Sequence, residues 1–234
     1  MAEARVVLVA GATGLVGQAV LAALLTADQS LVGDAAIAPA AVHVLHARGR
    51  RAPALSDPRL HLRAVDFTAQ PLLPAGLPAV NDVYITLGTT MAAAGSQSAF
   101  RAVDYDVVLA TARAARAAGA TRCGVVTAMG ANAQSPIFYN RVKGEVERDL
   151  QALGFETLVI ARPSLLMGER QALHQAPRRA EAVSIKLFSW LNPVIPADYR
   201  ARPGVDVARV LVHAVQSLPA GRHVLSGHAL QPAG

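Results

Sequence analysis

The chain has a single cysteine, Cys123, among its 234 residues. One cysteine excludes an internal disulfide bond and any metal site that is built from several cysteines. Cys123 lies in the apolar stretch RCGVVTA, and such a stretch predicts a buried strand residue rather than a reactive thiol.

Long apolar runs are also absent. No apolar run reaches the roughly 18 residues that a membrane-spanning helix needs, and we expect no membrane partner. Residues 6–25 are apolar enough to suggest a signal peptide, but Glu3 precedes them and three glycines interrupt them. A signal peptide has a basic start and an unbroken apolar centre, so we expect a cytoplasmic protein.

Lysine is scarce. Of 22 basic residues only Lys143 and Lys186 are lysines, and the formal net charge is +6. The arginines are scattered along the chain, whereas a nucleic-acid surface needs a concentrated basic patch. We therefore expect no nucleic-acid partner, and the local RGRR at 48–51 suits a small anionic ligand better.

The chain is rich in apolar residues, at 53% against 16% charged residues, which is typical of a well-buried globular domain. Short apolar runs alternate with longer helical patterns, and this alternation predicts parallel strands joined by helices. The expected strands are 5–10, 42–47, 60–65, 82–87, 122–127, 156–161 and 222–226. The expected helices are 14–26, 98–118, 136–153, 181–191 and 206–217.

The helix expected at 136–153 has the strongest local signals. Ser135 is a candidate N-cap, and Gly154 stands just past the end. From 163 to 203 prolines break the periodicity, which predicts a small irregular lobe on the substrate side of one domain, 1–234. On the helix expected at 136–153, the spacing also predicts two charge pairs four residues apart, Arg141 with Glu145 and Lys143 with Glu147.

Three glycines, Gly11, Gly14 and Gly17, follow the first expected strand and open the first expected helix. In dinucleotide-binding loops one glycine permits the tight turn, one lets the backbone approach the pyrophosphate, and one lets the helix pack on the strand. Backbone N–H groups at the helix N-terminus then face the phosphates. The position of the triplet therefore predicts dinucleotide binding.

The end of the second expected strand indicates which dinucleotide binds. An NAD site usually has a carboxylate there, against the ribose 2′-hydroxyl, but this chain has none between Asp34 and Asp57. It has Arg48, Arg50 and Arg51 instead, and arginine pairs well with a 2′-phosphate. This favours NADP(H) over NAD(H); the alternative is a solvated basic turn.

Tyr139 and Lys143 lie four residues apart on the helix expected at 136–153, so they share one face. A nearby ammonium favours the tyrosinate and lowers a phenol pKa that starts near ~10. A tyrosine tuned in this way exchanges a proton with a carbonyl or an alcohol near neutral pH. A plain surface pair is the usual explanation of such spacing, but its place after a dinucleotide loop favours catalysis.

Several segments together resemble the short-chain dehydrogenase/reductase superfamily. They are GATGLVG, VDF at 65–67, LGTT at 87–90, YNRVKGE at 139–145 and ARPSLL at 161–166. More narrowly, the chain resembles the atypical NAD(P)-binding members that are related to the oxidoreductase TIP30. This resemblance runs from about residue 5 to about residue 215.

The resemblance implies a role for each matching position. The pyrophosphate would be wrapped by Gly11, Thr13, Gly14, Leu15, Val16 and Gly17. Arg48, helped by Arg50 or Arg51, would hold the 2′-phosphate, and Asp66 with Phe67 would meet the adenine edge. Leu87, Gly88 and Thr89 would run along the ribose. Lys143 would hold the nicotinamide ribose and tune Tyr139. Against the nicotinamide would lie Pro163, Ser164, Leu165 and Leu166.

One position departs from the family pattern. Relatives usually carry a serine at the end of the fifth strand, whose hydroxyl orients the substrate carbonyl. This chain reads Thr127-Ala128 there, so Thr127 can supply a hydroxyl, but an alignment of the serine with Ala128 leaves none. Losing one such donor costs roughly 10²–10³ in rate.

These observations predict a Rossmann-type doubly wound α/β fold with a mainly parallel sheet. We expect an NADP(H)-dependent oxidoreductase that moves hydride between nicotinamide and a carbonyl or alcohol substrate, with Tyr139 as acid/base, Lys143 as its tuner and Thr127 as the orienting hydroxyl. Epimerisation or dehydration by the same residues stays open, as does a redox-sensing module that binds NADP(H) without catalysis. We expect no metal, and a homodimer is compatible with the pattern.

Overall fold

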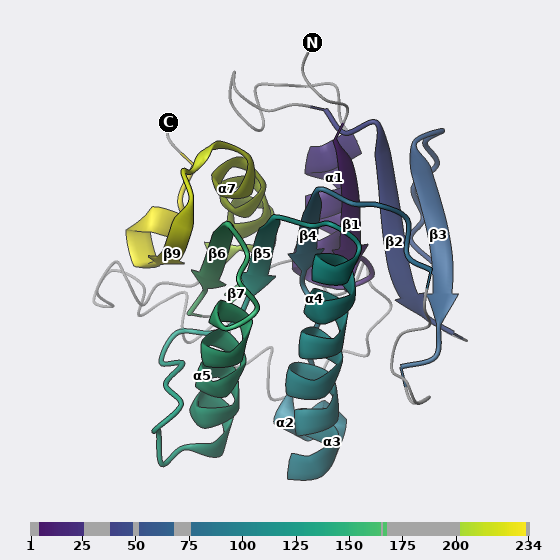
Figure 1. The fold of residues 1–234 in the computed structure, drawn as a ribbon. Coiled ribbons are helices and arrows are strands. Elements are labelled where there is room, and N and C mark those ends of the chain that lie inside the picture. Colours follow the sequence, from purple (N-terminus) through teal and green to yellow (C-terminus); the bar gives the residue numbers. More distant parts are fainter. Residues whose placement is uncertain are drawn as a thin grey trace.

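Seven parallel strands form one sheet in the order β3-β2-β1-β4-β5-β6-β9 (Figure 1). The computed structural model describes residues 5–25, 38–48, 52–67, 76–164, 166–167 and 202–232. The strands are β1 Val6–Ala10, β2 Ala41–Ala47, β3 Leu60–Val65, β4 Asp82–Ile85, β5 Arg122–Val126, β6 Thr157–Arg162 and β9 Gly221–Ser226. All seven expected strands are confirmed, and so is the doubly wound α/β fold.

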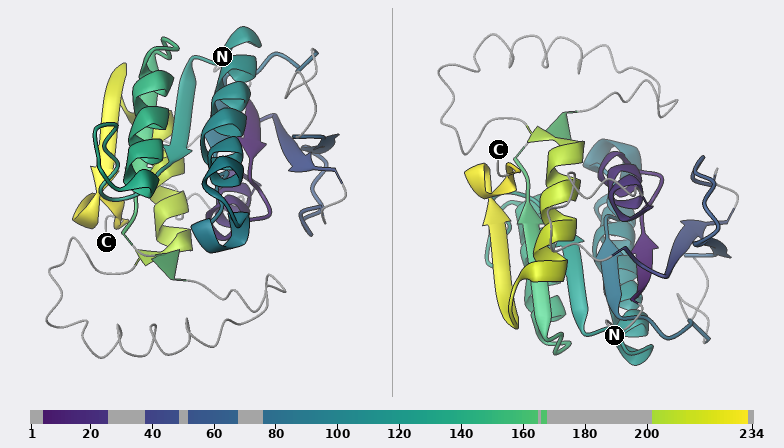
Figure 2. Two further views of the ribbon diagram at one scale, coloured as in Figure 1. Left: turned by 90° about the horizontal axis from the view of Figure 1, so that it is seen from below. Right: turned by 90° about the horizontal axis from the view of Figure 1, so that it is seen from above.

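Helices cover both faces of this sheet, α1 and α7 on one face and α4 and α5 on the other (Figures 1 and 2). The alternation of side chains along β1 explains the two layers, because Val7 and Val9 pack toward α1 and α7 while Leu8 and Ala10 pack toward α4 and α5. The helical elements are α1 Leu15–Leu25, α2 Met91–Ala94, α3 Gln97–Arg101, η2 Ala102–Val107, α4 Val108–Ala117, α5 Phe138–Gln151, α7 Gly204–Ser217 and η5 Gly227–Leu230.

The short strands β7, Leu166–Met167, and β8, Arg202–Pro203, pair in parallel beside the main sheet. The irregular lobe expected at 163–203 lies mostly outside the described residues, as does the helix expected at 181–191. Cys123 is a fully buried residue of β5, as its apolar neighbours predicted, and burial raises the pKa of its thiol.

Two expected helices differ in detail. The helix at 98–118 is helical throughout most of its length but contains a six-residue π-helix, η2, between α3 and α4. Helix α5 begins at Phe138 rather than at residue 136. The Ser135 hydroxyl instead accepts a hydrogen bond from the Ile137 N–H at 3.1 Å, in the turn before the helix.

Both charge pairs expected within α5 are wrong, because each partner contacts another part of the chain. Arg141 donates to the Ser135 carbonyl at 2.9 Å, and Glu145 pairs with Arg101 of α3. Lys143 and Glu147 each pair with a residue outside α5, Asp104 and Arg162 respectively. Lys143 and Glu147 are buried, and a charge that is removed from water needs a close partner more than an exposed one does.

Candidate functional site

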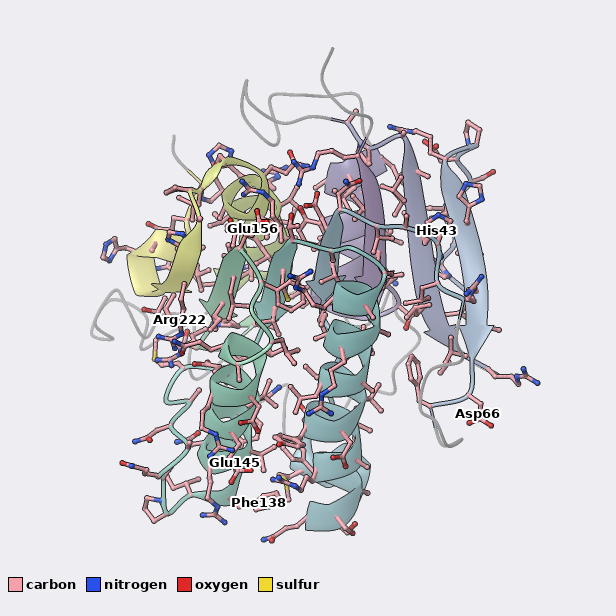
Figure 3. The ribbon with its side chains drawn as sticks, viewed as in Figure 1. His43, Asp66, Phe138, Glu145, Glu156 and Arg222 are labelled. Atoms are coloured by element: carbon pink, nitrogen blue, oxygen red, sulfur yellow. The ribbon has the colours of Figure 1, made fainter. Side chains whose placement is uncertain are left out.

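The carboxyl ends of the parallel strands form one edge of the sheet, and the expected site residues gather there. Asp66 lies at this edge just after β3, and Phe138 at the start of α5 lies beyond the edge on the same side. Glu156, just before β6, lies at the opposite edge (Figure 3). In open α/β sheets ligands bind outside the carboxyl ends of the strands, near the point where the strand order reverses. Here the order reverses between β1 and β4.

The three glycines lie in the turn between β1 and α1, and two of them, Gly11 and Gly17, have no room for a side chain. Gly11 has φ 91°, and a Cβ there would lie 2.6 Å from the Leu87 backbone nitrogen. A Cβ on Gly17 would lie 2.1 Å from the Gly11 carbonyl oxygen. At Gly14 the nearest atom to a Cβ would be 3.4 Å away, so this glycine is not needed for internal packing.

This turn has the properties that a pyrophosphate site requires. The Gly14 N–H closes the turn on the Gly11 carbonyl at 3.0 Å, and α1 starts at the next residue without an acidic side chain in its first turn. The N–H groups at the start of α1 thus carry the positive end of the helix dipole without a competing carboxylate. The residues present fit a dinucleotide phosphate.

The ends of β2 and β3 lie side by side next to this turn. The Arg48 N–H donates to the Val65 carbonyl at 2.8 Å, which places Arg48 beside the segment of Asp66 and Phe67. Arg48 and Asp66 are exposed, while Phe67 packs partly against the core. Arg50 and Arg51 lie outside the described residues.

The segment after β4 links the glycine turn to a buried ion pair. A Cβ on Gly88 would lie 3.4 Å from Asp104 Oδ1 and 3.9 Å from Lys143 Nζ. The Asp104 carboxylate pairs with the Lys143 ammonium at 2.7 Å and accepts the Thr89 N–H at 2.8 Å. The structure therefore brings the expected residues Leu87 to Thr89 and Lys143 together around Asp104.

Tyr139 lies on the first turn of α5, with its ring tilted against Phe100 at 5.4 Å between centroids. Burial, followed by the negative charge of Asp104, raises the pKa of the Tyr139 phenol above its ordinary value. The lowering that we expected from Lys143 is therefore wrong for this structure. The ammonium is already paired with Asp104, and the anion of that pair acts on the phenol.

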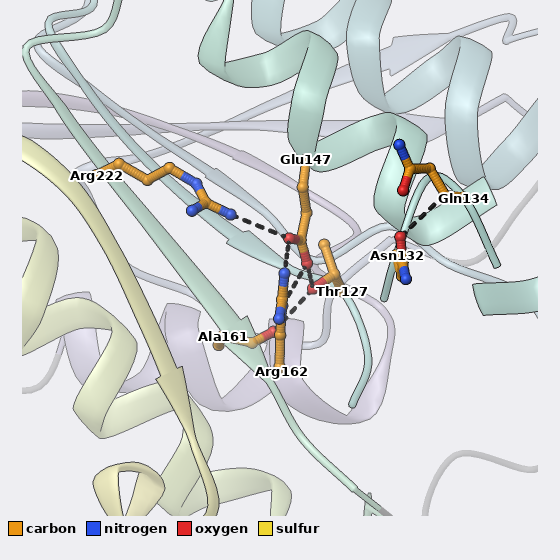
Figure 4. A network of polar contacts seen from close by, with 7 residues as sticks. All are labelled: Thr127, Asn132, Gln134, Glu147, Ala161, Arg162 and Arg222. Atoms are coloured by element: carbon orange, nitrogen blue, oxygen red, sulfur yellow. Dashed lines mark hydrogen bonds and ion pairs between the residues drawn. The ribbon is translucent and has the colours of Figure 1, made fainter. Parts of the chain in front are cut away.

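Thr127, directly after β5, commits its hydroxyl proton to a carboxylate. Its Oγ1 donates to Glu147 Oε1 at 2.7 Å (Figure 4). Glu147 is buried and also accepts from Arg162 Nε at 2.9 Å and from Arg222 Nη2 at 3.4 Å. This contact conflicts with the expected role of Thr127 as a donor to a substrate carbonyl, and Ala128 has no hydroxyl.

The remaining expected residues follow β6. The Met129 N–H donates to the Pro163 carbonyl at 2.9 Å, so the chain after β5 runs beside Pro163 and Ser164. Leu166 is partly buried in β7. Leu165 lies outside the described residues.

Two residues of the site, Asp104 and Glu147, were not predicted from the sequence. A signal existed for Asp104, because it lies on one apolar helix face with Phe100 and Val108, at a spacing of four residues. An acid on an apolar face needs a buried partner. For Glu147 the expected pairing with Lys143 hid its contact with Arg162.

Among the residues that the structure describes, no three His, Cys, Asp or Glu side chains are grouped so that they could hold a metal ion. Within the same ranges, no helix is both long and apolar enough to cross a membrane.

Solved structures with this fold are numerous. The enzyme WbmH of Bordetella bronchiseptica, in complex with NAD⁺, gives a TM-score of 0.64 at 16% identity, covering 95% of this chain and 75% of that chain. A short chain dehydrogenase family protein of Francisella tularensis gives a TM-score of 0.65 at 12% identity, covering 97% of this chain and 99% of that chain. Vestitone reductase from alfalfa gives a TM-score of 0.62 at 16% identity, covering 95% of this chain and 76% of that chain. The chain thus has the fold of short-chain dehydrogenase/reductase enzymes.

Curated relatives are closer in sequence, although no protein-family model matches the chain. "Protein FMP52, mitochondrial" of Candida albicans is 46% identical over 95 residues, which is 40% of this chain and 42% of that protein. The chain therefore matches less than half the length of that relative. These relatives are named as mitochondrial proteins, so our expectation of a cytoplasmic protein is wrong.

Two relatives match over most of their length. Protein FMP52 of Chaetomium globosum is 31% identical over 219 residues, 92% of this chain and 88% of that protein. The protein of the same name from Emericella nidulans is 36% identical over 180 residues, 74% of this chain and 70% of that protein. With identity above 30% along nearly the whole chain, the protein belongs to the FMP52 family.

Proposed function

We propose that the chain is an NADP(H)-dependent oxidoreductase of the short-chain dehydrogenase/reductase type that acts on a carbonyl or alcohol substrate. The observation that carries this proposal is the convergence of the glycine turn at Gly11–Gly17, the Asp104–Lys143 pair and Tyr139 at one edge of the sheet. The narrower relation to TIP30-like members is part of the same proposal and rests on YNRVKGE and GATGLVG.

The cofactor would bind along the carboxyl edge from β2 to β6. The glycine turn would hold the pyrophosphate through backbone N–H groups, and Arg48 would pair with the 2′-phosphate. Lys143 and the backbone at Thr89 would border the nicotinamide ribose, with Pro163 and Ser164 on the side of β6. A bound NADPH would supply the hydride that reduces the substrate carbonyl carbon.

Tyr139 would supply the proton. Its phenol is neutral at physiological pH, since a tyrosine ionises near pH ~10 and burial and Asp104 raise the Tyr139 pKa further. A neutral phenol donates a proton to the carbonyl oxygen. The same state is poorly suited to accept a proton from an alcohol. We therefore propose carbonyl reduction as the favoured direction at neutral pH.

The second candidate is a redox-sensing module that binds NADP(H) without turnover. It is favoured by Thr127, whose hydroxyl proton goes to Glu147 rather than to a substrate. Epimerisation or dehydration through a keto intermediate of the substrate would use the same residues. Since the relatives carry mitochondrial names, we also propose that this chain works in mitochondria.

The substitution Tyr139→Phe separates the two candidates. Purified protein would be screened with NADPH against a panel of aldehydes and ketones, following the loss of NADPH absorbance. We expect Tyr139→Phe to lower turnover by about 10²–10⁴ with NADPH affinity unchanged. The matched control is Tyr105→Phe, whose hydroxyl donates to Asp149 between η2 and α5. Unchanged turnover in Tyr139→Phe would remove the acid role of Tyr139, whereas NADPH binding by the wild type without turnover of any substrate in the panel would favour the sensor.

A further inference from the structure

Asp104 is a fully buried carboxylate on the π-helix η2, and its partners Lys143 and Thr89 lie on other elements. It pairs with the Lys143 ammonium of α5 at 2.7 Å, where Lys143 is only 6% exposed. It also accepts the N–H of Thr89, after β4, at 2.8 Å. One carboxylate thereby joins a helix on one side of the site to the strand end on the other.

Both partners are groups that the proposed function places along the nicotinamide ribose. The backbone of Gly88 passes directly over the ion pair, since a Cβ there would lie 3.4 Å from Asp104 Oδ1 and 3.9 Å from Lys143 Nζ. A Cβ at residue 88 would make ordinary van der Waals contact with both charged groups. The buried pair therefore lies directly behind the backbone of the segment after β4.

The backbone around Asp104 is unusual. Residues 102–107 form a π-helix inside an otherwise α-helical stretch. Such π-helical turns are rare in proteins, and where they occur they often lie at functional sites. Asp104 lies on the buried face of this stretch with Phe100, whose ring packs against Tyr139. Even a well-paired buried carboxylate adds little net stability, so its position between Lys143 and Thr89 is the better explanation of its presence here.

The same carboxylate acts on Tyr139. Its negative charge, together with burial, raises the pKa of the phenol. Lys143 does not act as an isolated ammonium beside the phenol, because Asp104 balances its charge. Other charged residues of α3 and α5 form ion pairs nearer the surface: Arg101 pairs with Glu145, and Arg148 pairs with Asp149.

We propose that Asp104 is a positioning residue of the active centre, which fixes the Lys143 ammonium and the backbone at Thr89 beside the cofactor ribose and holds a negative charge near the Tyr139 phenol. This inference rests on the proposed function for its meaning in catalysis. A neutral phenol can give a proton to a carbonyl oxygen, which is the proton that carbonyl reduction needs.

The test is the ionisation of Tyr139 in the protein without cofactor. Tyrosine labelled with ¹³C at the ring carbon next to the hydroxyl reports ionisation by NMR, and Tyr139→Phe identifies the signal. We expect Asp104→Asn to lower the pKa of Tyr139 relative to the wild type. The control Asp106→Asn makes the same change at an exposed position of the same π-helix, and it should leave the titration unchanged.

Two outcomes would overturn the proposal: an unchanged Tyr139 titration in Asp104→Asn, or equal shifts in both variants. If Asp104→Asn fails to fold, the double variant Asp104→Asn with Lys143→Gln replaces both charges by amides. Under the proposal its Tyr139 pKa lies below that of Lys143→Gln alone, and equality of the two would contradict it.

A second readout is NADPH affinity. Removing the charge that holds Lys143 should weaken NADPH binding by about 10-fold in Asp104→Asn, as expected for a hydrogen bond to a charged group, with no effect in Asp106→Asn. If neither protein nor variant binds NADPH, the proposed function fails while the titration still decides the electrostatic role of Asp104. A shifted titration with unchanged NADPH affinity would contradict the positioning of Lys143.

Discussion

At the scale of single residues, the protonation state of Tyr139 sets what the site can do. An ordinary tyrosine ionises near pH ~10, and burial with the Asp104 charge moves the Tyr139 pKa upward. The proton-donating form is therefore fully populated at neutral pH and persists to a higher pH than in an ordinary tyrosine. This is opposite to the tuning that the Tyr139–Lys143 spacing alone suggested.

The pH dependence of reduction follows from this sign. The rate with saturating NADPH should show no loss from Tyr139 ionisation between pH 7 and about 10, and should fall only at higher pH as the phenol ionises. Stopped-flow measurement of NADPH oxidation across this range, with Tyr139→Phe as the background, checks the prediction. A loss centred near pH 7 that Tyr139→Phe abolishes would show that the ammonium dominates after all.

The glycines of the turn predict a contrast between two similar substitutions. In Gly17→Ala the new Cβ would lie 2.1 Å from the Gly11 carbonyl oxygen, so we expect a loss of about 3 kcal/mol or more in unfolding free energy. In Gly14→Ala the nearest atom is 3.4 Å away, so stability should stay within about 1 kcal/mol. The methyl group of Gly14→Ala should nevertheless weaken NADPH binding, because it occupies space that the phosphate would use.

Urea unfolding followed by circular dichroism, combined with NADPH titration of each variant, measures both effects. A stable Gly17→Ala protein would contradict the described turn. A stable Gly14→Ala protein with wild-type NADPH affinity would contradict the assignment of the phosphate to this turn.

At the scale of elements, α5 is held by contacts that its own sequence did not reveal. The segment FYNRVKGEVE suggested a helix with internal charge pairs, but its charges contact other elements. Lys143 pairs with Asp104 of η2, and Glu147 joins α5 to the carboxyl ends of β5 and β6 and to Arg222 near the start of β9 (Figure 4). Spacing along a helix predicts which residues share a face. The spacing cannot predict which residue of another element a charged side chain pairs with, because that depends on burial.

Glu147 should therefore matter for stability more than its neighbour Glu145. Glu147→Gln leaves Arg162, Arg222 and Thr127 without their carboxylate. Removing one partner of a fully buried ion pair costs about 3–5 kcal/mol, and since both arginines reach solvent we expect about 2 kcal/mol here. Glu145→Gln, in its more exposed pair with Arg101, should cost less than about 1 kcal/mol.

Chemical denaturation of both variants at neutral pH makes the comparison. Equal losses in the two variants would contradict the central place of Glu147. A loss in Glu147→Gln with unchanged α5 helicity, seen by amide exchange, would localise its role to the junction of α5 with the strand ends.

At the scale of the whole molecule, the sequence predicted the architecture well. Apolar runs such as VVLVA at β1 and RCGVV at β5 are buried on both faces, and this pattern together with helical spacers implies a parallel sheet covered on both sides. The glycine triplet then placed the turn at the first strand end. These signals are local, so they were readable without the fold.

The site was only partly predictable, because its chemistry depends on residues that meet across the fold. Asp104 lies 39 positions before Lys143 and 35 before Tyr139, and its carboxylate reverses the effect expected from the ammonium. Thr127 was read as a free hydroxyl, but its partner Glu147 comes from another element. Cellular location was not readable from composition at all, and the named relatives corrected it.

The most direct test of the central claim is a paired titration of the purified protein with NADPH and NADH, following nicotinamide fluorescence. We expect NADPH to bind more tightly, and Arg48→Ala to weaken NADPH by about 10-fold or more while leaving NADH unchanged. Arg116→Ala, at the carboxyl end of α4, is the matched control and should have no effect. Absence of binding by either nucleotide would contradict the account, because the turn at Gly11–Gly17 would then have its shape without the ligand assigned to it.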